Sequence, residues 1–201
     1  MKLILASKNR HKILEIKSIL KDFNWEIIAL SDLAPDFTIT EDGKTFEENA
    51  IKKAESVMSK FGLITLGEDT GLEVDILNSR PGIFSARYAG ENASYEQNVK
   101  KLLAELKNVP LEKRTARFIC VCAVAFPRQF NRKTEVFQGI CEGHIIDEVR
   151  GKTGFGYDPI FVPNGCDKTF AEMSAEEKNR ISHRAKALEK VKKYLNQLKI
   201  V

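Results

Sequence analysis

Apolar and polar residues alternate along the first third of the chain in the patterns of strands and helices. Residues 2–6 form a short apolar run, and after a polar stretch the apolar residues of 13–20 recur at the spacing of one helix face. A second apolar run at 26–30 predicts another strand, and residues 44–62 have the spacing of an amphipathic helix. The pattern therefore predicts strand, helix, strand and helix in that order.

Two pairs of residues mark where predicted helices begin. Thr45 and Glu48 have the spacing of a capping box, in which each side chain accepts a hydrogen bond from the other's backbone N–H, and Gly62 ends the same helix. Ser174 and Glu177 form a second such pair before a lysine-rich segment. This segment predicts a terminal helix whose inward-facing residues are Ala185, Leu188, Val191 and Leu195.

The middle of the chain is rich in strand patterns. Residues 63–69 and 71–77 predict two strands, and a helix follows from Ser94 after a loop punctuated by Gly and Pro. Between 114 and 126 the odd and the even positions are both apolar, so we expect this strand to be buried on both faces. Residues 134–146 predict its hairpin partner. A sheet that is covered on two sides is implied.

These elements together predict an α/β protein with a mixed, largely buried central sheet flanked by helices. A last short strand at 158–162 follows a Gly-rich stretch. The length of 201 residues suits one domain, which we expect to span residues 1–201. Polar loops at the ends of strands are the expected place for a functional site.

Composition and charge narrow the class of protein. With 43% hydrophobic and 30% charged residues, the chain is typical of a globular protein rather than a disordered one. A formal net charge of +4 is too small for a dedicated nucleic-acid binder and suits a small phosphate-bearing molecule equally well. The four cysteines include no CxxC pair, and no apolar stretch approaches the roughly 18 residues that span a bilayer. We therefore expect a reduced, cytoplasmic protein that has no signal peptide and does not bind nucleic acid or membranes.

The first polar loop combines Ser7, Asn9 and Lys12 between a strand and the start of a helix. The unpaired N–H groups and the dipole at a helix start favour an anion, so this loop is a candidate phosphate site. It lacks a Walker-type glycine run. On the alternative interpretation, Ser7 or Asn9 only caps the helix and Lys12 is solvated.

Four acidic residues lie near a predicted helix start and a predicted strand end, and they are Glu47, Glu48, Glu68 and Asp69. Carboxylate oxygens suit Mg²⁺, which usually takes one or two carboxylates and leaves its other positions to water and substrate phosphates. A remaining carboxylate could accept a proton from an attacking water. On the alternative interpretation, Glu48 is only a capping residue, and Glu68 and Asp69 end a solvated strand.

Two further segments carry side chains that could bind a nucleobase. In the segment TGFGYDP at 153–159, the glycines allow close approach of a ligand, and Phe155 or Tyr157 offers a flat face for stacking. Near a later helix start, His183 and Arg184 could donate hydrogen bonds to base oxygens or to phosphate. The alternatives are a tight turn with a buried aromatic residue and a solvated basic helix face.

Six segments follow one another between residues 7 and 188, and they are SKNRHK, TFEENAIKKA, GEDTGLEVD, PGIFSARYAG, GFGYDPIF and EEKNRISHRAKAL. In this order they closely resemble the noncanonical purine nucleoside triphosphate pyrophosphatases, the inosine triphosphate pyrophosphatase family. The resemblance implies Mg²⁺-dependent hydrolysis of ITP, dITP and XTP at the α-phosphorus, to a monophosphate and pyrophosphate, which cleanses the nucleotide pool. It also implies a homodimer, and two lobes with the active site in the cleft between them.

The resemblance further implies roles for individual residues. The substrate-binding residues of the first loop are Ser7, Lys8, Asn9, Arg10, His11 and Lys12. Lys53 falls where the family has a phosphate-neutralising lysine. The proton acceptor is Asp69 or its neighbour Glu68, and the metal carboxylates are Glu48 and Asp69. Thr70 falls on the following substrate contact, and Ser85 and Arg87 fall at the edge of the site. The base-contacting residues are Phe155, Gly156, Tyr157, Asp158, Lys178, His183 and Arg184.

Two other functions remain open. A related septum-inhibitor type of nucleotide pyrophosphatase shares the phosphate chemistry but accepts pyrimidine or modified nucleotides, and FGYDP followed by SHR disfavours it. A nucleic-acid-binding module would use the basic loops and the lysine-rich terminal helix. That module gives no role to the four acids near the phosphate site, which would repel a phosphate backbone.

Overall fold

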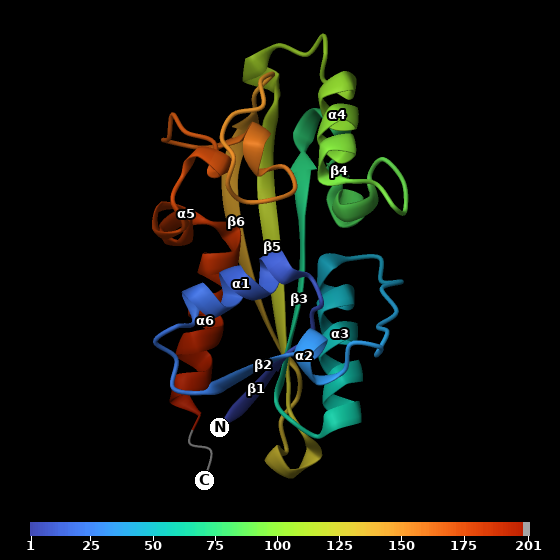
Figure 1. Cartoon of the computed structure of the whole chain (residues 1–201), viewed down its shortest axis with the longest axis vertical. Helices are drawn as coiled ribbons and strands as arrows, with labels where there is room; N and C mark the ends of the chain where they lie inside the picture. The colour runs from blue at the N-terminus through green and yellow to red at the C-terminus, as the bar shows by residue number, and fades with distance from the viewer. Residues whose placement is uncertain (199–201) are drawn as a thin grey trace. The chain divides into compact units, whose positions relative to one another are not determined.

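The computed structural model describes residues 1–198 of the chain (Figure 1). Two compact units make up the domain expected over residues 1–201, and each unit is built from separate stretches of the chain. The first unit consists of residues 1–69 and 120–139 and the described residues from 184 on, and the second consists of residues 70–119 and 140–183. Residues 199–201 lie outside the described range.

The elements are helices and strands in mixed order. The strands are β1 (Lys2–Leu5), β2 (Glu26–Ala29), β3 (Thr65–Val74), β4 (Arg80–Pro81), β5 (Thr115–Ala125), β6 (Glu135–Ile145) and β7 (Phe161–Pro163). The α-helices are α1 (Arg10–Ile19), α2 (Leu30–Leu33), α3 (Phe46–Phe61), α4 (Tyr95–Glu105), α5 (Ala175–Ile181) and α6 (His183–Gln197). Short 3-10 turns span Asp75–Leu77, Gly82–Arg87, Leu111–Lys113, Arg128–Phe130, Asp158–Ile160 and Phe170–Glu172. The predicted α/β class with a mixed sheet is confirmed.

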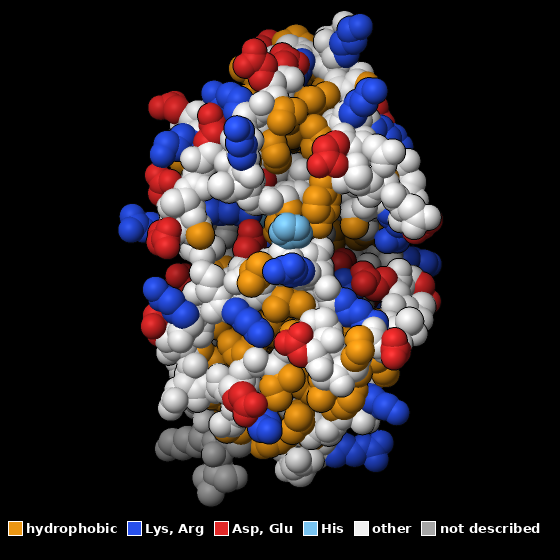
Figure 2. All heavy atoms as spheres, in the orientation of Figure 1, with side chains coloured by type: hydrophobic (Ala, Val, Ile, Leu, Met, Phe, Trp, Pro, Cys, Tyr) orange, Lys and Arg blue, Asp and Glu red, His pale blue; other side chains and the backbone are white. Residues whose placement is uncertain are grey.

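Charged side chains of both signs are interspersed on the face shown in Figure 2. Neither sign gathers into a continuous patch there, whereas nucleic-acid binding uses a basic patch or stripe. Within residues 1–198, no helix has the length and apolar character needed to cross a membrane.

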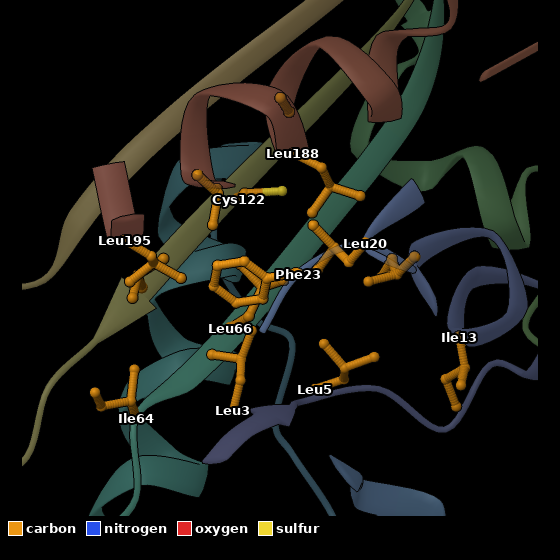
Figure 3. Close-up of a cluster of buried hydrophobic side chains, with 14 of the residues drawn as sticks. Leu3, Leu5, Ile13, Leu20, Phe23, Ile64, Leu66, Cys122, Leu188 and Leu195 are labelled. Carbon is orange, nitrogen blue, oxygen red and sulfur yellow. The ribbon is translucent and has the colours of Figure 1, made fainter. Parts of the chain in front are cut away.

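In the first unit, β1 lies between β2 and β3 and is parallel to both. The side chains of β1 alternate between two apolar clusters. Leu3 and Leu5 face the cluster formed with α1 and α6 (Figure 3). Ile4 packs instead with Leu30 and Val57 of α2 and α3. The predicted inward faces of the first and last helices are confirmed, because the buried residues include Ile13, Ile16, Leu20, Ala185, Leu188, Val191 and Leu195. Helices therefore cover both faces of this part of the sheet.

In the second unit, β4 is antiparallel to β3, and β7 is antiparallel to β6. The core here packs α4 against aromatic side chains, with Phe118 between 4.8 and 5.9 Å from the rings of Phe161 and Phe170. Strand β5 is buried at every position from Phe118 to Ala125, which confirms the prediction of a strand covered on two sides.

Three predicted element boundaries are wrong. The strand expected at 158–162 begins only at Phe161, because Asp158–Ile160 form a 3-10 turn with a proline in it. The two strands expected around Thr70 are the single strand β3, because Gly71 does not adopt a positive φ and the backbone stays extended. The single terminal helix is instead α5 followed by α6, because Ser182 between them has an extended backbone with φ −66° and ψ 153°. Serine favours such helix ends because its hydroxyl competes for backbone hydrogen bonds.

The helix starts are predicted better than the helix ends. The capping box of Ser174 and Glu177 is confirmed, with both reciprocal hydrogen bonds present. At α3, the Thr45 hydroxyl accepts from the Glu48 N–H at 3.1 Å. The Glu48 carboxylate, however, accepts from the N–H of Lys44 at 2.7 Å, so only one half of that box forms. The predicted stop at residue 62 is confirmed.

Candidate functional site

A glycine brings α3 close to β3 in the first unit. A Cβ added to Gly67 would lie 2.2 Å from the Ala50 carbonyl oxygen and 2.6 Å from the Ala54 nitrogen, so only a glycine allows this approach. Gly67 immediately precedes Glu68 and Asp69 in β3. The contact therefore places Asp69, two residues further along β3, beside Lys53 of α3.

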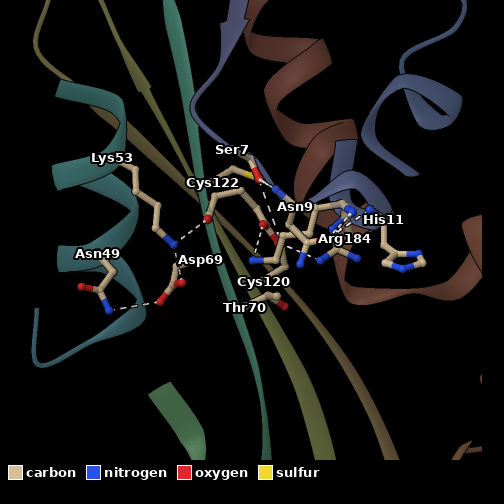
Figure 4. Close-up of polar contacts among 12 residues, drawn as sticks. Ser7, Asn9, His11, Asn49, Lys53, Asp69, Thr70, Cys120, Cys122 and Arg184 are labelled. Carbon is tan, nitrogen blue, oxygen red and sulfur yellow. Dashed lines mark hydrogen bonds and ion pairs between the residues drawn. The ribbon is translucent and has the colours of Figure 1, made fainter. Parts of the chain in front are cut away.

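Lys53 and Asp69 form the centre of a buried ion pair (Figure 4). The Lys53 ammonium lies 2.8 Å from Asp69 Oδ1 and 2.7 Å from a Glu41 carboxylate oxygen, and it donates to the Glu68 carbonyl at 3.2 Å. Asn49 Nδ2 donates to the other oxygen of Asp69 at 3.3 Å. Both oxygens of Asp69 are thus oriented by side chains of α3.

The carboxylates keep Lys53 charged although it is 5% exposed. Burial lowers the pKa of Lys53, but the charges and hydrogen bonds of Asp69 and Glu41 raise it by more, and the net pKa is raised. The ammonium is therefore available as a full positive charge at neutral pH. Its acceptors are two acids and one carbonyl in this structure.

Glu68 is 3% exposed and is surrounded by donors from three other elements. Lys12 of α1 lies 2.8 Å from Oε2, and Arg184 of α6 lies 3.0 Å from Oε1. The Cys120 thiol of β5 donates to Oε1 at 3.4 Å. Burial raises the pKa of Glu68, but Lys12 and Arg184 outweigh burial, so the pKa is held well below its usual range. Arg184 is also paired with Glu15 of α1.

The first polar loop caps α1. The Asn9 side chain accepts from the backbone N–H groups of His11 and Lys12 at 3.0 and 3.2 Å, and the Ser7 hydroxyl accepts from the Asn9 N–H at 3.2 Å. The capping role left open by the sequence is confirmed for Asn9. A solvated Lys12 is wrong, because its ammonium contacts Glu68 and its side chain is 15% exposed. Exposed residues flank it, and they are Lys8, Arg10 and His11.

The two predicted metal ligands, Glu48 and Asp69, lie on α3 and β3, which the hydrogen bond from Asn49 to Asp69 joins. Glu48 precedes Asn49 at the exposed start of α3, and Asp69 belongs to β3. Within residues 1–198, no group of three His, Cys, Asp or Glu side chains forms a metal cage. Mg²⁺ does not require such a cage, because one or two carboxylates with waters and phosphates hold it. The donor chemistry of the acids therefore fits Mg²⁺.

In the second unit, the Asp158 carboxylate accepts hydrogen bonds from two other residues of the predicted base-contacting set. Its Oδ2 accepts from the Lys178 ammonium at 2.7 Å and from the Phe155 N–H at 2.9 Å. Lys178 is 5% exposed and lies 5.4 Å from the centre of the Phe155 ring. Tyr157 is 3% exposed, and its hydroxyl donates to the Ser85 carbonyl at 3.0 Å. The buried-aromatic alternative is thus confirmed for Tyr157, whereas Phe155 is half-buried.

The remaining predicted residues of this unit have structural partners. His183 is buried and stacks on Phe118 with ring centres 4.7 Å apart and planes 10° apart. The Thr70 hydroxyl donates to the Ile119 carbonyl at 2.6 Å. The Ser85 hydroxyl accepts from the Leu72 N–H at 2.9 Å and donates to the Gly82 carbonyl at 2.6 Å, which are contacts of a buried structural residue. Arg87 lies over the ring of Phe84.

The structure brings five predicted residues together in the first unit, and they are Lys12, Lys53, Glu68, Asp69 and Arg184. It brings Phe155, Asp158 and Lys178 together in the second. Sequence reasoning missed Glu15, Glu41, Asn49 and Cys120, which contact these sets. Glu41 lies in a segment without periodicity, and Cys120 looks like any apolar residue of its strand, so neither carried a recognisable pattern.

Comparisons with known sequences cover almost the whole chain. Residues 3–194 match the model of the Ham1 family. The chain is 49% identical over 195 residues to a protein of Thermoanaerobacter pseudethanolicus named dITP/XTP pyrophosphatase, which covers 97% of this chain and 96% of that protein. It is 50% identical over 197 residues to a protein of Clostridium perfringens with the same name, covering 95% of each.

Solved structures have the same fold. The Ham1 protein of Staphylococcus aureus matches with a TM-score of 0.86 and 44% identity over 98% of each chain. A protein of Mycobacterium abscessus described as a nucleoside-triphosphatase / dITP/XTP pyrophosphatase matches with a TM-score of 0.75 and 39% identity, covering 95% of this chain and 98% of that one.

Proposed function

This chain belongs to the Ham1 family, and on that premise we propose that it is a Mg²⁺-dependent nucleoside triphosphate pyrophosphatase. Its substrates are noncanonical purine nucleoside triphosphates, namely ITP, dITP and XTP. Water attacks the α-phosphorus and releases the monophosphate and pyrophosphate, which clears damaged purines from the nucleotide pool. The observation that carries the proposal is the buried set of two acids and two lysines around Glu68 and Asp69, in a chain whose relatives are named dITP/XTP pyrophosphatases.

The lysines of this set supply positive charge where a triphosphate is negative. In this structure the ammonium groups of Lys12 and Lys53 contact carboxylates. When a triphosphate binds, its oxygens replace these carboxylates as acceptors. Glu41 is the most exposed of these carboxylates, at 44% of its side chain, and is the acceptor most easily replaced. Charges fixed in this way stabilise the departing pyrophosphate. The exposed residues of the loop, namely Lys8, Arg10 and His11, add positive charge beside the phosphates, and Thr70 is a further substrate contact.

Asp69 is the proton acceptor in this proposal. Asn49 and Lys53 each hold one of its oxygens, so the carboxylate is oriented before substrate arrives. Mg²⁺ would be held by Glu48 and Asp69, and when bound it neutralises phosphate charge and lowers the pKa of coordinated water. Glu68 keeps its negative charge at any physiological pH because its pKa is lowered. It is the second acid available for the reaction.

Selection of the base rests on hydrogen-bond donors. Hypoxanthine and xanthine present a 6-oxo acceptor, whereas adenine presents a 6-amino donor, so a pocket of donors disfavours adenine. We assign these donors to Lys178, His183, Arg184 and the N–H groups of the Gly156 loop, with Phe155 as the stacking surface. The side chains of Tyr157 and Asp158 contact other residues of the protein. The backbone of these two residues and the residues next to them would therefore meet a base. The homodimer stays a prediction from the resemblance, and the cytoplasmic location stays a prediction from the cysteine pattern and the apolar runs of the sequence.

A product analysis tests the proposal. The purified protein is incubated with ITP, XTP, GTP and ATP, with Mg²⁺ or with EDTA, and nucleotides, pyrophosphate and orthophosphate are quantified. We expect monophosphate and pyrophosphate from ITP and XTP, and loss of both products in EDTA. Diphosphate with orthophosphate would place the attack at the γ-phosphorus and overturn the proposal. An equal rate with ATP would overturn the assignment of substrate class.

A further inference from the structure

Cys120 of β5 contacts the buried acid that the proposed reaction uses. Its side chain is 0% exposed, and its thiol donates to Glu68 Oε1 at 3.4 Å. The sulfur of Cys122, two residues along the strand, lies 3.8 Å from the sulfur of Cys120 (Figure 4). The two thiols and the carboxylate therefore form a row inside the first unit.

The two oxygens of Glu68 have different surroundings. Oε1 accepts from Arg184 and Cys120, whose side chains are 1% and 0% exposed. Oε2 is paired with Lys12, whose side chain is 15% exposed and belongs to the first polar loop and helix start. One oxygen is thus fixed by buried groups, and the other is turned toward the group proposed to meet phosphate.

Toward Glu68, the thiol of Cys120 acts as a donor. Burial, the Cys122 thiol and the Glu68 carboxylate all raise the pKa of Cys120 well above its ordinary value, so the proton stays on sulfur. The Glu68 carboxylate is ionised, and a hydrogen bond to an ionised group is stronger than one between neutral groups. The thiol proton therefore points at Glu68 Oε1 rather than at solvent.

We propose that Cys120 is a positioning residue for the reaction, acting through Glu68. Together with Arg184 it fixes Oε1, so that Oε2 remains directed at Lys12 when that lysine turns to substrate phosphate. This inference rests on the proposed function, because Glu68 is assigned to the reaction there. Cys120 does not touch substrate, so its loss lowers kcat and leaves KM almost unchanged.

Four variants test this role, with Cys122 as the matched control. Cys122 is equally buried on the same strand, and its recorded sulfur contact is with Cys120. Cys120→Ala, Cys120→Ser, Cys122→Ala and Cys122→Ser are compared for ITP hydrolysis at a temperature where circular dichroism shows each folded. We expect Cys120→Ala to lower kcat about threefold to tenfold, the loss of one donor to a charged acceptor. Cys120→Ser keeps a donor and recovers most of the parent kcat, and both Cys122 variants stay within twofold of the parent.

Other patterns overturn the proposal. If the alanine variants at both positions lower kcat equally, or if Cys120→Ala is no less active than Cys120→Ser, the cysteine only fills space. A rise in KM without a fall in kcat would also contradict a role through Glu68. Failure of the proposed function itself is distinct, because then the parent protein does not hydrolyse ITP.

Discussion

Replacing Arg184 with methionine tests the electrostatics of the buried set most directly. The guanidinium is 1% exposed and pairs with Glu68, which is 3% exposed, and with Glu15. Methionine has a similar length and removes the charge. Glu68 then keeps the ion pair with Lys12, and Lys53 is a further, weaker source of positive charge. The variant therefore leaves a buried carboxylate with less compensating charge.

The size of the effect follows from this burial. Removing one partner of a buried ion pair costs about 3–5 kcal/mol, because the remaining charge is poorly solvated. In the parent, burial raises the Glu68 pKa but Lys12 and Arg184 lower it by more, so the carboxylate contributes stability down to strongly acidic pH. Without Arg184 the folded-state pKa rises. The carboxylate then takes up a proton at a higher pH than in the folded parent, so the stability lost by the variant is largest at neutral pH and shrinks in the acid range, toward about pH 3.

Urea unfolding followed by circular dichroism at pH 7 and pH 3 measures both effects. The matched control is Arg114→Met in the second unit, because Arg114 is 4% exposed but its acid partner, Asp147, is 71% exposed. Both variants lose stability at pH 7, and Arg184→Met recovers more of its loss at pH 3, by about 1 kcal/mol. The double variant Arg184→Met with Glu68→Gln loses less than the sum of the single losses, because the unpaired charge is gone.

Two outcomes would refute this reasoning. One is a loss for Arg184→Met that is the same at both pH values, since it would mean that Glu68 does not titrate in the variant. The other is strict additivity in the double variant, which would show that Arg184 and Glu68 are not energetically coupled.

Three further outcomes are expected. Asp69→Asn abolishes ITP turnover and keeps the parent circular dichroism spectrum, and near-parental activity would remove Asp69 as proton acceptor. Gly67→Ala lowers the unfolding free energy by about 1–3 kcal/mol, because its methyl group would meet the Ala50 carbonyl; an unchanged urea midpoint would contradict the close approach of α3. Lys178→Met narrows the ratio of ITP to ATP kcat/KM at least tenfold, and an unchanged ratio would exclude Lys178 from base selection.

The sequence predicts those parts of the fold that depend on local pattern. The burial of β5 on both faces follows from the apolar residues at its odd and even positions. The helix caps at Asn9 and Ser174 follow from the short polar side chains that precede the helices. The break at Ser182 was missed, because serine also occurs within helices and the apolar spacing continues past it.

The site is less predictable, because its partners are far apart in the chain. Arg184 and Glu68 are 116 positions apart, and no local pattern distinguishes a buried arginine that pairs with a carboxylate from one that meets a ligand. The family resemblance placed both residues in the site, but it did not predict that they contact each other. Cys120 could not be separated from its apolar neighbours, since its role depends on which side chain lies opposite it.

The division of the first unit into three stretches has a consequence for how the protein is made. A ribosome releases Lys12 and Glu68 early, whereas Arg184 of α6 follows Glu68 by 116 positions. Until α6 is made, Glu68 has only part of its compensating charge, and the sheet has an uncovered face. The acid and lysine set therefore forms only after α6 has been synthesised, and a chain stopped before α6 would be a substrate for proteases rather than a smaller enzyme.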